Sequence, residues 1–420
     1  MSRYCGPTVF VSMRACHNGG MAYTLSQDQA AALTQIGAWY RTRSSPYLTL
    51  GGYAGTGKTT LIAYLRQALR QHDDSARVAF CAYTGKAARV LTERLRDQNV
   101  PRKDDSVSTI HSLIYTTAEK DNGSSPVWVR KESLERDLII VDEASMVDAA
   151  IWDDLLSFGI PILAVGDHGQ LPPVGSTFSL MKDPQIRLER IFRQAKGSPI
   201  IDVATLARES GALPVTVYGT GVMKLDKSQP ETGIMVQELL ESWRSDLLIL
   251  CGYNATRVKL NQAIRSYRDL ESPDPQSGDQ VVCLRNNRSQ HIFNGMIGRI
   301  VHVTPALLDE DGAWYEAEIE LDGEDYTYSG YILRGQFGAA TTVKDVPLAP
   351  NGERGDLWDF GYALTVHKAQ GSQSQRVLLF EERFGRSSDE DWRRWLYTAV
   401  TRAQEELIII GPNPAPYRED

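Results

Sequence analysis

Several features that mark membrane, secreted and metal-binding proteins are missing from this sequence. No apolar run approaches the roughly 18 residues that a membrane-spanning helix needs, and residues 1–20 lack the long apolar core of a signal peptide. The cysteines number only five, are scattered and include no C-x-x-C pair, so neither a disulfide framework nor a zinc site is indicated. These absences favour a cytoplasmic protein in which Cys81 and Cys251 are free thiols within buried strands.

Basic residues are also in short supply, because acidic side chains outnumber them and the net charge is −8. This balance excludes a uniformly basic nucleic-acid coat but allows a local basic groove. A hydrophobic content of 42% over 420 residues is enough for large cores and predicts two or three domains. Residues 1–20 show no periodicity and end in Asn18-Gly19-Gly20, so we expect a disordered extension there.

One stretch matches the pattern G-x-x-x-x-G-K-[ST], which cradles the phosphates of nucleotides. Residues 47–50 before it are predicted to form a short buried strand and residues 60–72 after it a helix, which is the setting that the pattern requires. Backbone N–H groups can turn toward a polyphosphate here, Lys58 can reach the β- and γ-phosphates, and Thr59 can ligate Mg²⁺. The predicted nucleotide-binding residues are Gly55, Thr56, Gly57, Lys58, Thr59 and Thr60. The alternative is a glycine-rich turn that binds nothing.

Two adjacent carboxylates follow another predicted buried strand, residues 138–141. Asp142 would hold Mg²⁺ directly or through a water molecule, and Glu143 would take a proton from the attacking water. A further strand, residues 160–165, leads to Gln170, which could sense the γ-phosphate. Acidic residues also end strands for solubility alone, but the phosphate loop upstream favours the catalytic interpretation.

Another continuous apolar run, residues 78–83, is typical of a strand covered on both faces, and it ends at Thr84. Ligands bind in loops at the carboxyl ends of parallel strands. Thr84 and Lys86 could therefore meet nucleic-acid phosphates, and the alternative is a helix cap and a solvated lysine. Upstream, Ser26 is predicted to cap a helix containing Gln29, which from the local pattern could be an ordinary surface glutamine.

The second half of the chain repeats the strand and helix units. Strands are predicted at residues 247–250, 376–380 and 407–410, and they indicate a second parallel-sheet lobe. Residues 275–354 interrupt this lobe with glycine-rich, alternating segments and a hairpin signal at Asp322-Gly323. Short strands separated by turns predict a small β-barrel there.

A shorter insertion is predicted in the first lobe, at residues 113–133. The connection is longer than a plain loop requires, and the turn at residues 121–126 is flanked by β-branched and aromatic residues that suit a hairpin. An exposed aromatic side chain there could stack on a base pair, with Trp128 the first candidate and Tyr115 the second. The alternative is that Trp128 packs the hairpin onto the first lobe.

Eight segments in this order resemble the motifs of superfamily 1 DNA helicases, and more closely those of the Dda and RecD branch that moves 5′→3′ on single-stranded DNA. The segments are GYAGTGKTT, TGKAA, STIHS, VDEAS, GDHGQLPPV, LERIFRQ, TVHKAQGSQ and YTAVTRA. The resemblance implies an α/β fold class with two RecA-like parallel-sheet lobes, the hairpin inserted in the first and an SH3-like β-barrel in the second. The implied domains are residues 21–190 for the first lobe, 191–274 plus 355–420 for the second lobe, and 275–354 for the barrel.

The resemblance also implies roles for individual residues. Gln29 would contact adenine, Gln170 would sense the γ-phosphate and Gln370 would contact the nucleotide. Arg193 and Arg402 would act as arginine fingers, the latter within a predicted helix. The side chains implied to lie along DNA are Thr84, His111, Thr365, His367 and Lys368, and the hairpin with Trp128 would form a pin that splits the duplex. Gln373 is a departure, because relatives often carry an acidic residue at this place near the ribose.

Together these features predict an ATP-dependent DNA helicase that uses ATP and Mg²⁺, binds single-stranded DNA and duplex junctions, and works as a monomer, with replication or recombination proteins as partners. Three alternatives stay open. A phosphate-transfer kinase leaves the second lobe unexplained. A single-stranded DNA translocase or recombination-complex subunit would not unwind alone, and a nucleotide-gated binding module would not hydrolyse ATP.

Overall fold

The computed structural model describes residues 25–413, apart from residues 99, 101–102, 119–126, 173–177, 192–196, 288, 308, 310 and 353. The extension expected at residues 1–20 lies outside the described residues. The chain divides into two compact units. The first comprises the chain up to residue 83 with residues 87–114 and 131–197, and the second comprises residues 84–86, 115–130 and the chain from residue 198.

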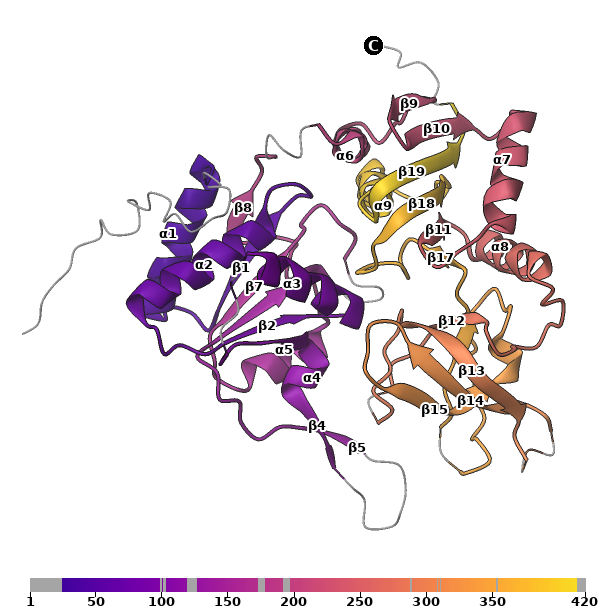
Figure 1. Ribbon diagram of the computed structural model, residues 1–420, viewed down its shortest axis with the longest axis horizontal. Coiled ribbons are helices and arrows are strands. Elements are labelled where there is room, and N and C mark those ends of the chain that lie inside the picture. Colours follow the sequence, from indigo (N-terminus) through magenta and orange to yellow (C-terminus); the bar gives the residue numbers. More distant parts are fainter. Residues whose placement is uncertain are drawn as a thin grey trace, which may run out of the picture. The chain divides into compact units, whose positions relative to one another are not determined.

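The first unit is built on a six-stranded parallel sheet in the order β3-β2-β6-β7-β1-β8 (Figure 1). Its strands are β1 (Tyr47–Gly52), β2 (Val78–Ala82), β3 (Ser106–Thr109), β6 (Leu138–Asp142), β7 (Ile162–Gly166) and β8 (Ile186–Leu188). The helices along this part of the chain are α1 (Gln27–Thr42), α2 (Lys58–His72), α3 (Gly85–Asp97), α4 (Ile110–Ile114), the 3-10 helix Ala144–Met146 and α5 (Ala149–Leu156).

Both faces of this sheet are buried. Val78 and Phe80 share one hydrophobic cluster with residues of α1, α2 and α3, and their neighbours Ala79 and Cys81, which point to the opposite face, are buried as well. Strand residues alternate between faces, so a sheet covered on both sides needs apolar residues at every position. The continuous apolar runs in the sequence therefore predicted these strands correctly, and Cys81 and Cys251 are buried free thiols as expected.

The second unit contains a six-stranded sheet in the order β17-β11-β18-β19-β10-β9, in which β9 is antiparallel to β10 and the other pairings are parallel. Its strands are β9 (Thr216–Gly219), β10 (Val222–Asp226), β11 (Leu247–Cys251), β17 (Ala363–Thr365), β18 (Ser374–Phe380) and β19 (Ala403–Gly411). The helices are α6 (Pro199–Glu209), α7 (Pro230–Glu241), α8 (Asn254–Tyr267) and α9 (Asp389–Val400). Counted along the chain within each unit, the first five parallel strands of both sheets are arranged third, second, fourth, fifth, first. The second lobe thus repeats the topology of the first, which confirms the predicted fold class.

A five-stranded antiparallel sheet in the order β15-β14-β13-β12-β16 is inserted between α8 and β17. Its strands are β12 (Gln280–Cys283), β13 (Ile297–Pro305), β14 (Trp314–Leu321), β15 (Thr327–Leu333) and β16 (Trp358–Phe360), and the 3-10 helix Arg334–Gln336 follows β15. Buried and exposed residues alternate along the second half of β14, and β14 pairs with β15 across the predicted turn, where Gly323 has a φ of 82°. The N–H of Leu333 donates to Asp356 O (3.1 Å), so the two edges of the sheet meet, as in a barrel.

One face of α8 fastens this inserted sheet to the parallel sheet. Arg257 forms an ion pair with Asp359 of β16 at 2.6 Å, and Arg265 forms one with Asp279, just before β12, at 2.9 Å. Midway between them, Asn261 exchanges two hydrogen bonds with the backbone of β17, at Ala363. Since residues four apart lie on the same side of a helix, three buried polar anchors are aligned along α8.

The predicted hairpin insertion is present as the antiparallel pair β4 (Tyr115–Ala118) and β5 (Val127–Arg130), with Thr117 opposite Trp128. The turn predicted at residues 121–126 lies outside the described residues, as does the side chain of Trp128. Tyr115 is buried, so its choice as an exposed aromatic was wrong. The role of Trp128 stays a prediction.

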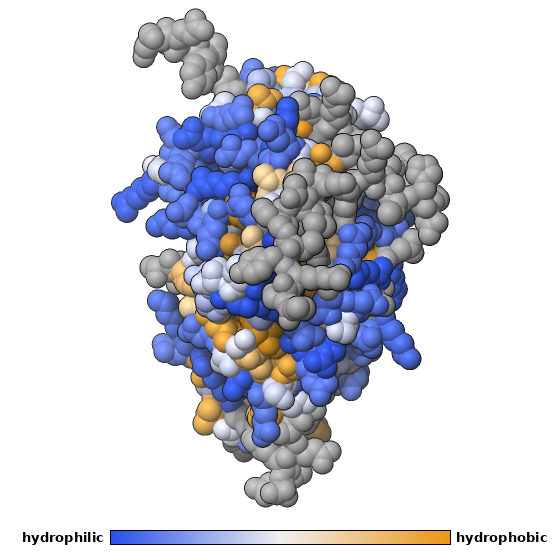
Figure 2. Space-filling view, turned by 90° about the vertical axis from the view of Figure 1, so that its left-hand side faces the viewer, coloured by the Kyte–Doolittle hydropathy of each residue, from blue (hydrophilic) through white to orange (hydrophobic). Residues whose placement is uncertain are grey.

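The surface carries few large hydrophobic side chains. Within the described ranges, no helix is long and apolar enough to traverse a bilayer. Figure 2 shows one face of the molecule, where hydrophilic residues predominate and hydrophobic residues form smaller areas between them. Single exposed hydrophobic residues are normal, so those that are also held in a fixed position are the informative ones.

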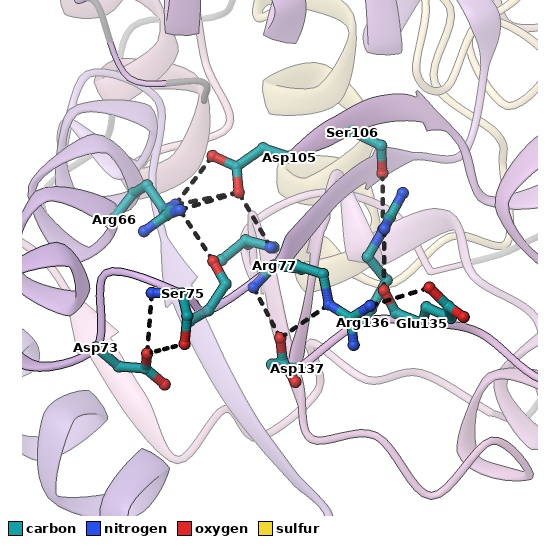
Figure 3. A network of polar contacts seen from close by, with 11 residues as sticks. Arg66, Asp73, Ser75, Arg77, Asp105, Ser106, Glu135, Arg136 and Asp137 are labelled. Carbon is teal, nitrogen blue, oxygen red and sulfur yellow. Dashed lines mark hydrogen bonds and ion pairs between the residues drawn. The ribbon is translucent and has the colours of Figure 1, made fainter. Parts of the chain in front are cut away.

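The amino ends of β2, β3 and β6 are joined by a network of charged residues (Figure 3). At its centre, the buried Arg66 of α2 donates to Asp105 through Nε (3.0 Å) and to Ala76 O through Nη2 (3.0 Å). Asp105 also accepts from the N–H of Val78 (3.0 Å). At the rim, Glu135 forms an exposed ion pair with Arg77. The network ties the start of β2 to the segment before β3, at the edge of the sheet opposite to the phosphate loop.

An Arg66→Met variant is expected to lose about 3–5 kcal/mol of unfolding free energy, because it leaves the Asp105 carboxylate buried without its cation. Glu135→Ala, at the same edge, removes an exposed pair and should cost at most about 1 kcal/mol. Urea denaturation of the two variants beside the unmodified chain is the measurement. Equal midpoints for both variants would contradict a structural role for the buried pair.

Candidate functional site

The phosphate loop connects β1 to α2 and has the backbone shape that the pattern predicts. Gly55 and Gly57 take positive φ values of 79° and 75°, which side chains rarely allow. Gly57 is the N-cap of α2, and no side chain caps this end of the helix. The first N–H groups of α2 have no partner within the helix, so the loop and helix end form an anion-binding site.

Lys58 lies over this loop. Its Nζ donates to the carbonyl oxygens of Gly52 (2.6 Å) and Tyr53 (3.1 Å), and the hydroxyl of Thr56 donates to Tyr53 O (2.8 Å). These bonds keep the ammonium group inside the curve of the loop, where it can meet the β- and γ-phosphates of a nucleotide.

Gln29 braces the loop from α1 and is fully buried, so its description as a surface glutamine was wrong. Its Oε1 accepts from the N–H of Ser26 (3.1 Å), which completes the predicted cap of α1, and its Nε2 donates to Thr56 O (2.9 Å). The amide therefore ties the start of α1 to the phosphate loop. The contact with adenine stays a prediction.

The paired carboxylates lie at the same edge of the sheet. Asp142 ends β6, and β7 separates β6 from β1, so the carboxylates and the loop are two strands apart. Burial raises the pKa of Asp142 above its ordinary value, the charge of Glu143 adds to the shift, and the charge of Lys58 opposes it. Lys58 and the Asp142 carboxylate are thus close enough to act on one another electrostatically.

Glu143 is held in an unusual state. Its backbone has a φ of 52°, in the left-handed region that non-glycine residues rarely adopt. Its Oε2 is buried and accepts no hydrogen bond from any residue that the structure describes. A buried acceptor without a partner is costly. Among the described residues nothing occupies this oxygen, so it is available to accept from a water molecule.

Gln170 follows β7, which runs between β6 and β1, and is buried. Asp167 shapes its loop by accepting from the N–H of Gly169 (2.9 Å). The ring of His168 in this loop lies 4.2 Å from the ring of Tyr53 in the phosphate loop. The two loops are thus in contact through a pair of rings. Both residues stand in motifs, but nothing else in the sequence indicates this contact.

The residues predicted around the second sheet form their own group, in the second unit. The chain turns after β17, where the backbone N–H groups of Lys368 and Ala369 donate to the carbonyl oxygen of Thr365 at 2.9 and 3.0 Å. Thr365 and Gln370 are buried, whereas His367 and Lys368 are partly exposed. Burial, together with repulsion from Arg257, lowers the pKa of Lys368 to about 8.

Arg402 was predicted to lie within a helix, and this was wrong. The helix α9 ends at Val400 with Thr401 as its C-cap, so Arg402 lies just beyond it. Its guanidinium is fully buried, with Nε donating to Thr398 O (2.9 Å) and Nη1 to Ser372 O (3.3 Å). These bonds join two of the predicted motifs, T-V-H-K-A-Q-G-S-Q and Y-T-A-V-T-R-A. Nearby, Gln373 Oε1 accepts from Gln404 Nε2 at 3.3 Å.

The remaining predicted site residues are less well placed for their roles, or not described. Thr84 lies two residues beyond the end of β2, at the carboxyl edge of the first sheet. His111 lies in α4 with 2% of its surface exposed and its ring 5.8 Å from that of Tyr83, which favours packing over contact with DNA. Arg193 lies outside the described residues.

The oxygen donors beside the phosphate loop fit Mg²⁺. In the part of the chain that the structure describes, no three His, Cys, Asp or Glu side chains gather into a metal site made by protein alone. Mg²⁺ usually takes one or two protein oxygens together with substrate phosphates. The Thr59 hydroxyl and the Asp142 carboxylate are donors of this kind, and the unpartnered Glu143 oxygen fits a water next to them.

A phosphate loop, paired carboxylates and a glutamine at the carboxyl edge of a parallel sheet define a P-loop nucleotide-binding protein. Known families agree with this class. Residues 24–220 match the model of an AAA domain, and residues 360–410 match that of a UvrD-like helicase C-terminal domain. These matches and the relatives below make the chain similar to superfamily 1 helicases of the Dda and RecD type.

The chain is 30% identical over 415 residues to the ATP-dependent RecD2 DNA helicase of Deinococcus radiodurans, covering 92% of this chain and 49% of that protein. It is 26% identical over 394 residues to the RecBCD enzyme subunit RecD of Mycobacterium tuberculosis, covering 86% of this chain and 66% of that protein. The chain thus spans about half the length of RecD2. Among solved structures, Bacteroides Pif1 bound to single-stranded DNA aligns over 92% of both chains, at 17% identity and a TM-score of 0.46.

Proposed function

We propose that the protein is an ATP-dependent DNA helicase that moves 5′→3′ on single-stranded DNA and unwinds duplex ahead of it. The observation that carries the proposal is the buried Glu143 oxygen, which has no hydrogen-bond partner among the described residues and lies on the edge of the sheet that also carries Lys58 and Asp142. A carboxylate held in this way suits a base that takes a proton from water. The identity to RecD2, an ATP-dependent DNA helicase, supports ATP and DNA as the substrates.

In the proposed reaction, the phosphate loop and Lys58 bind the phosphates of ATP, and Thr59 and Asp142 hold Mg²⁺. Bound Mg²⁺ neutralises charge on the β- and γ-phosphates. Glu143 orients the attacking water and accepts its proton, while Gln170 responds to the γ-phosphate. Gln29 keeps the loop in shape through Thr56, so it contributes to binding even before any contact with adenine.

Two groups of side chains are proposed to contact DNA. Thr84 follows β2 of the first sheet, and the others follow or end β17 of the second sheet: Thr365, His367 and Lys368. Contacts to phosphates give grip without sequence preference. An arginine that stabilises the transition state in only one conformation would couple hydrolysis to movement, and Arg402 and Arg193 are proposed for this role.

The test is unwinding of duplexes that carry a single-stranded tail at either end. A 5′→3′ helicase separates the 5′-tailed duplex when ATP and Mg²⁺ are present and leaves the 3′-tailed duplex intact. Separation of the 3′-tailed duplex alone would overturn the polarity. The absence of DNA-stimulated ATP hydrolysis would overturn the helicase proposal as a whole.

The second candidate is a DNA translocase that works as a subunit and does not unwind alone. It is favoured by the identity to RecD, which is a subunit of the RecBCD enzyme. A translocase would hydrolyse ATP on single-stranded DNA and displace a bound protein from it, yet leave both tailed duplexes intact.

The affinity for single-stranded DNA is expected to fall as the pH rises from about 7 to about 9, because the pKa of Lys368 is lowered to about 8. The ammonium group is charged below this pKa and neutral above it, and a bound phosphate moves the change to somewhat higher pH. Lys368→Arg should remove the fall, since arginine stays charged over this range.

The measurement is the salt dependence of oligothymidylate binding at both pH values. The loss of one phosphate contact lowers the slope of log affinity against log salt by about 0.7. An unchanged pH dependence in Lys368→Arg would show that Lys368 does not touch the DNA.

A further inference from the structure

One exposed aromatic ring in the second unit is held in place more firmly than its exposure requires. Tyr253 follows β11 and is the N-cap of α8, and it is 42% exposed. Its backbone N–H donates to Glu382 Oε2 (2.9 Å), and its hydroxyl donates to Arg383 O (2.9 Å). Its ring meets that of Phe384 edge to face, with centroids 5.1 Å apart.

Fixing the ring of Tyr253 in this way stabilises the fold less than burying the ring would. Fixing a side chain costs conformational entropy, and an aromatic ring normally returns that cost by being buried. Tyr253 is fixed at the backbone, at the ring and at the hydroxyl, yet much of its ring remains in water. A rigid, exposed ring is prepared to bind a flat apolar partner, because no further ordering is needed on binding.

The position of Tyr253 in the sheet indicates which partner. β11 and β17 are neighbours in the second sheet (Figure 1). They run parallel with Cys251 paired to Thr365, so Tyr253 and His367 each lie two residues beyond this pair. His367 also faces Phe384, with ring centroids 6.3 Å apart. Lys368 comes next along the chain. Aromatic rings and a cation therefore occupy one carboxyl edge of the second sheet.

The acidic residue close to this group is occupied. The Glu382 carboxylate accepts hydrogen bonds from the N–H groups of Gly252 and Tyr253 and from the Thr256 hydroxyl. Both of its oxygens are therefore engaged at the start of α8. Arg383 is paired with Asp389. Lys368 is the cation that follows His367 in this group, and a cation beside aromatic rings suits a polyanion whose flat groups can stack.

We propose that Tyr253 is a stacking platform for an unpaired nucleobase of single-stranded DNA, with Lys368 next to the adjoining phosphate. This subsite rests on the proposed function and specifies where the second lobe holds a base. The ring supplies a face that every base can use, so the contact adds affinity without sequence preference. The proposal concerns binding at the second sheet and does not depend on the nucleotide site.

The experiment compares oligothymidylate binding by the unmodified chain with binding by three variants. Tyr253→Ala should weaken binding at least about fivefold, the lower end of what one stacked base contributes. Tyr253→Phe keeps the ring and should stay within about twofold. The matched control is Tyr267→Ala, because Tyr267 is 43% exposed at the opposite end of the same helix, and it should bind as the unmodified chain does.

Two further readouts separate stacking from a general loss of structure. Tyr253→Ala should keep the salt dependence of binding, because a base contact releases no counterions, whereas Lys368→Gln should lower it. A second readout uses oligothymidylates that each carry one abasic site at a different position. At one position the abasic site should weaken binding to the unmodified chain but leave the affinity of Tyr253→Ala unchanged. If Tyr253→Ala does not fold, Tyr253→Leu retains apolar contact with Phe384 and takes its place.

The outcomes distinguish this subsite from the proposed function. The subsite is overturned, and the proposed function stands, if the unmodified chain binds oligothymidylate and both Tyr253→Ala and Tyr267→Ala bind it equally well. A lower salt dependence in Tyr253→Ala with no abasic position rescued also overturns it. Unmodified chain that binds no single-stranded DNA overturns both.

Discussion

A Lys58→Ala variant is expected to lose nucleotide binding together with ATP turnover, whereas Glu143→Gln should keep binding and lose hydrolysis by a factor of at least about 10². Lys58 is the cation within the phosphate loop, so its removal affects ground state and transition state alike. Glu143→Gln preserves size but cannot accept a proton from water. The pair of variants thus separates holding the nucleotide from cleaving it.

The measurements are the affinity for a fluorescent ATP analogue and the steady-state ATPase rate with and without oligothymidylate. Glu135→Gln is the matched control, because Glu135 is an exposed carboxylate in the charged network at the amino ends of the strands. It should change neither quantity. Turnover at the unmodified rate in Glu143→Gln would remove the base from the proposed mechanism, and normal affinity in Lys58→Ala would remove the phosphate site.

An Arg402→Ala variant is expected to lower kcat by on the order of 10³ while nucleotide affinity changes little, as for an arginine that acts on the transition state. The guanidinium is fully buried and bonded to Thr398 O and Ser372 O, so the same change also removes structural bonds. Loss of activity alone therefore does not establish the catalytic role.

A structural arginine of similar burial provides the comparison. Arg265→Met breaks a buried ion pair with Asp279 and should lower thermal stability, yet keep kcat per folded molecule. Arg402→Ala should lower kcat far more than Arg265→Met at equal loss of stability. If the two variants keep the same kcat after correction for folded fraction, Arg402 acts as a structural residue that joins two motifs.

The fold was predictable where local pattern and tertiary environment agree. β2 is apolar at every position and β6 at every position before its last residue, Asp142, because both faces of the sheet are covered. The phosphate loop is set by its glycines and lysine. β10 was missed for a physical reason. Lys224 stands in the middle of this strand and breaks its apolar run, and it is buried because it forms an ion pair with Glu381, more than 150 residues away in the sequence.

The site was predictable to a similar limit. Residue types at fixed spacing predicted roles for Lys58, Asp142 and Glu143, since their chemistry is carried by the motif itself, and the structure brings the three residues to one edge of the sheet. Gln29 could not be recognised as buried, because the carbonyl that it serves belongs to Thr56 on another element. The contact between Tyr53 and His168 and the fixed ring of Tyr253 also depend on which strand ends lie side by side, and this arrangement is known only once the sheet order is known.

The three anchors along α8 have a mechanical consequence. Pivoting of the antiparallel sheet about α8 would have to break the pair of Arg257 with Asp359 or that of Arg265 with Asp279, and breaking a buried pair costs about 3–5 kcal/mol. Asn261 holds the same helix to β17. A force applied to the inserted sheet is therefore transmitted to the parallel sheet through α8. The helix acts as a rigid connection between the two sheets and not as a hinge.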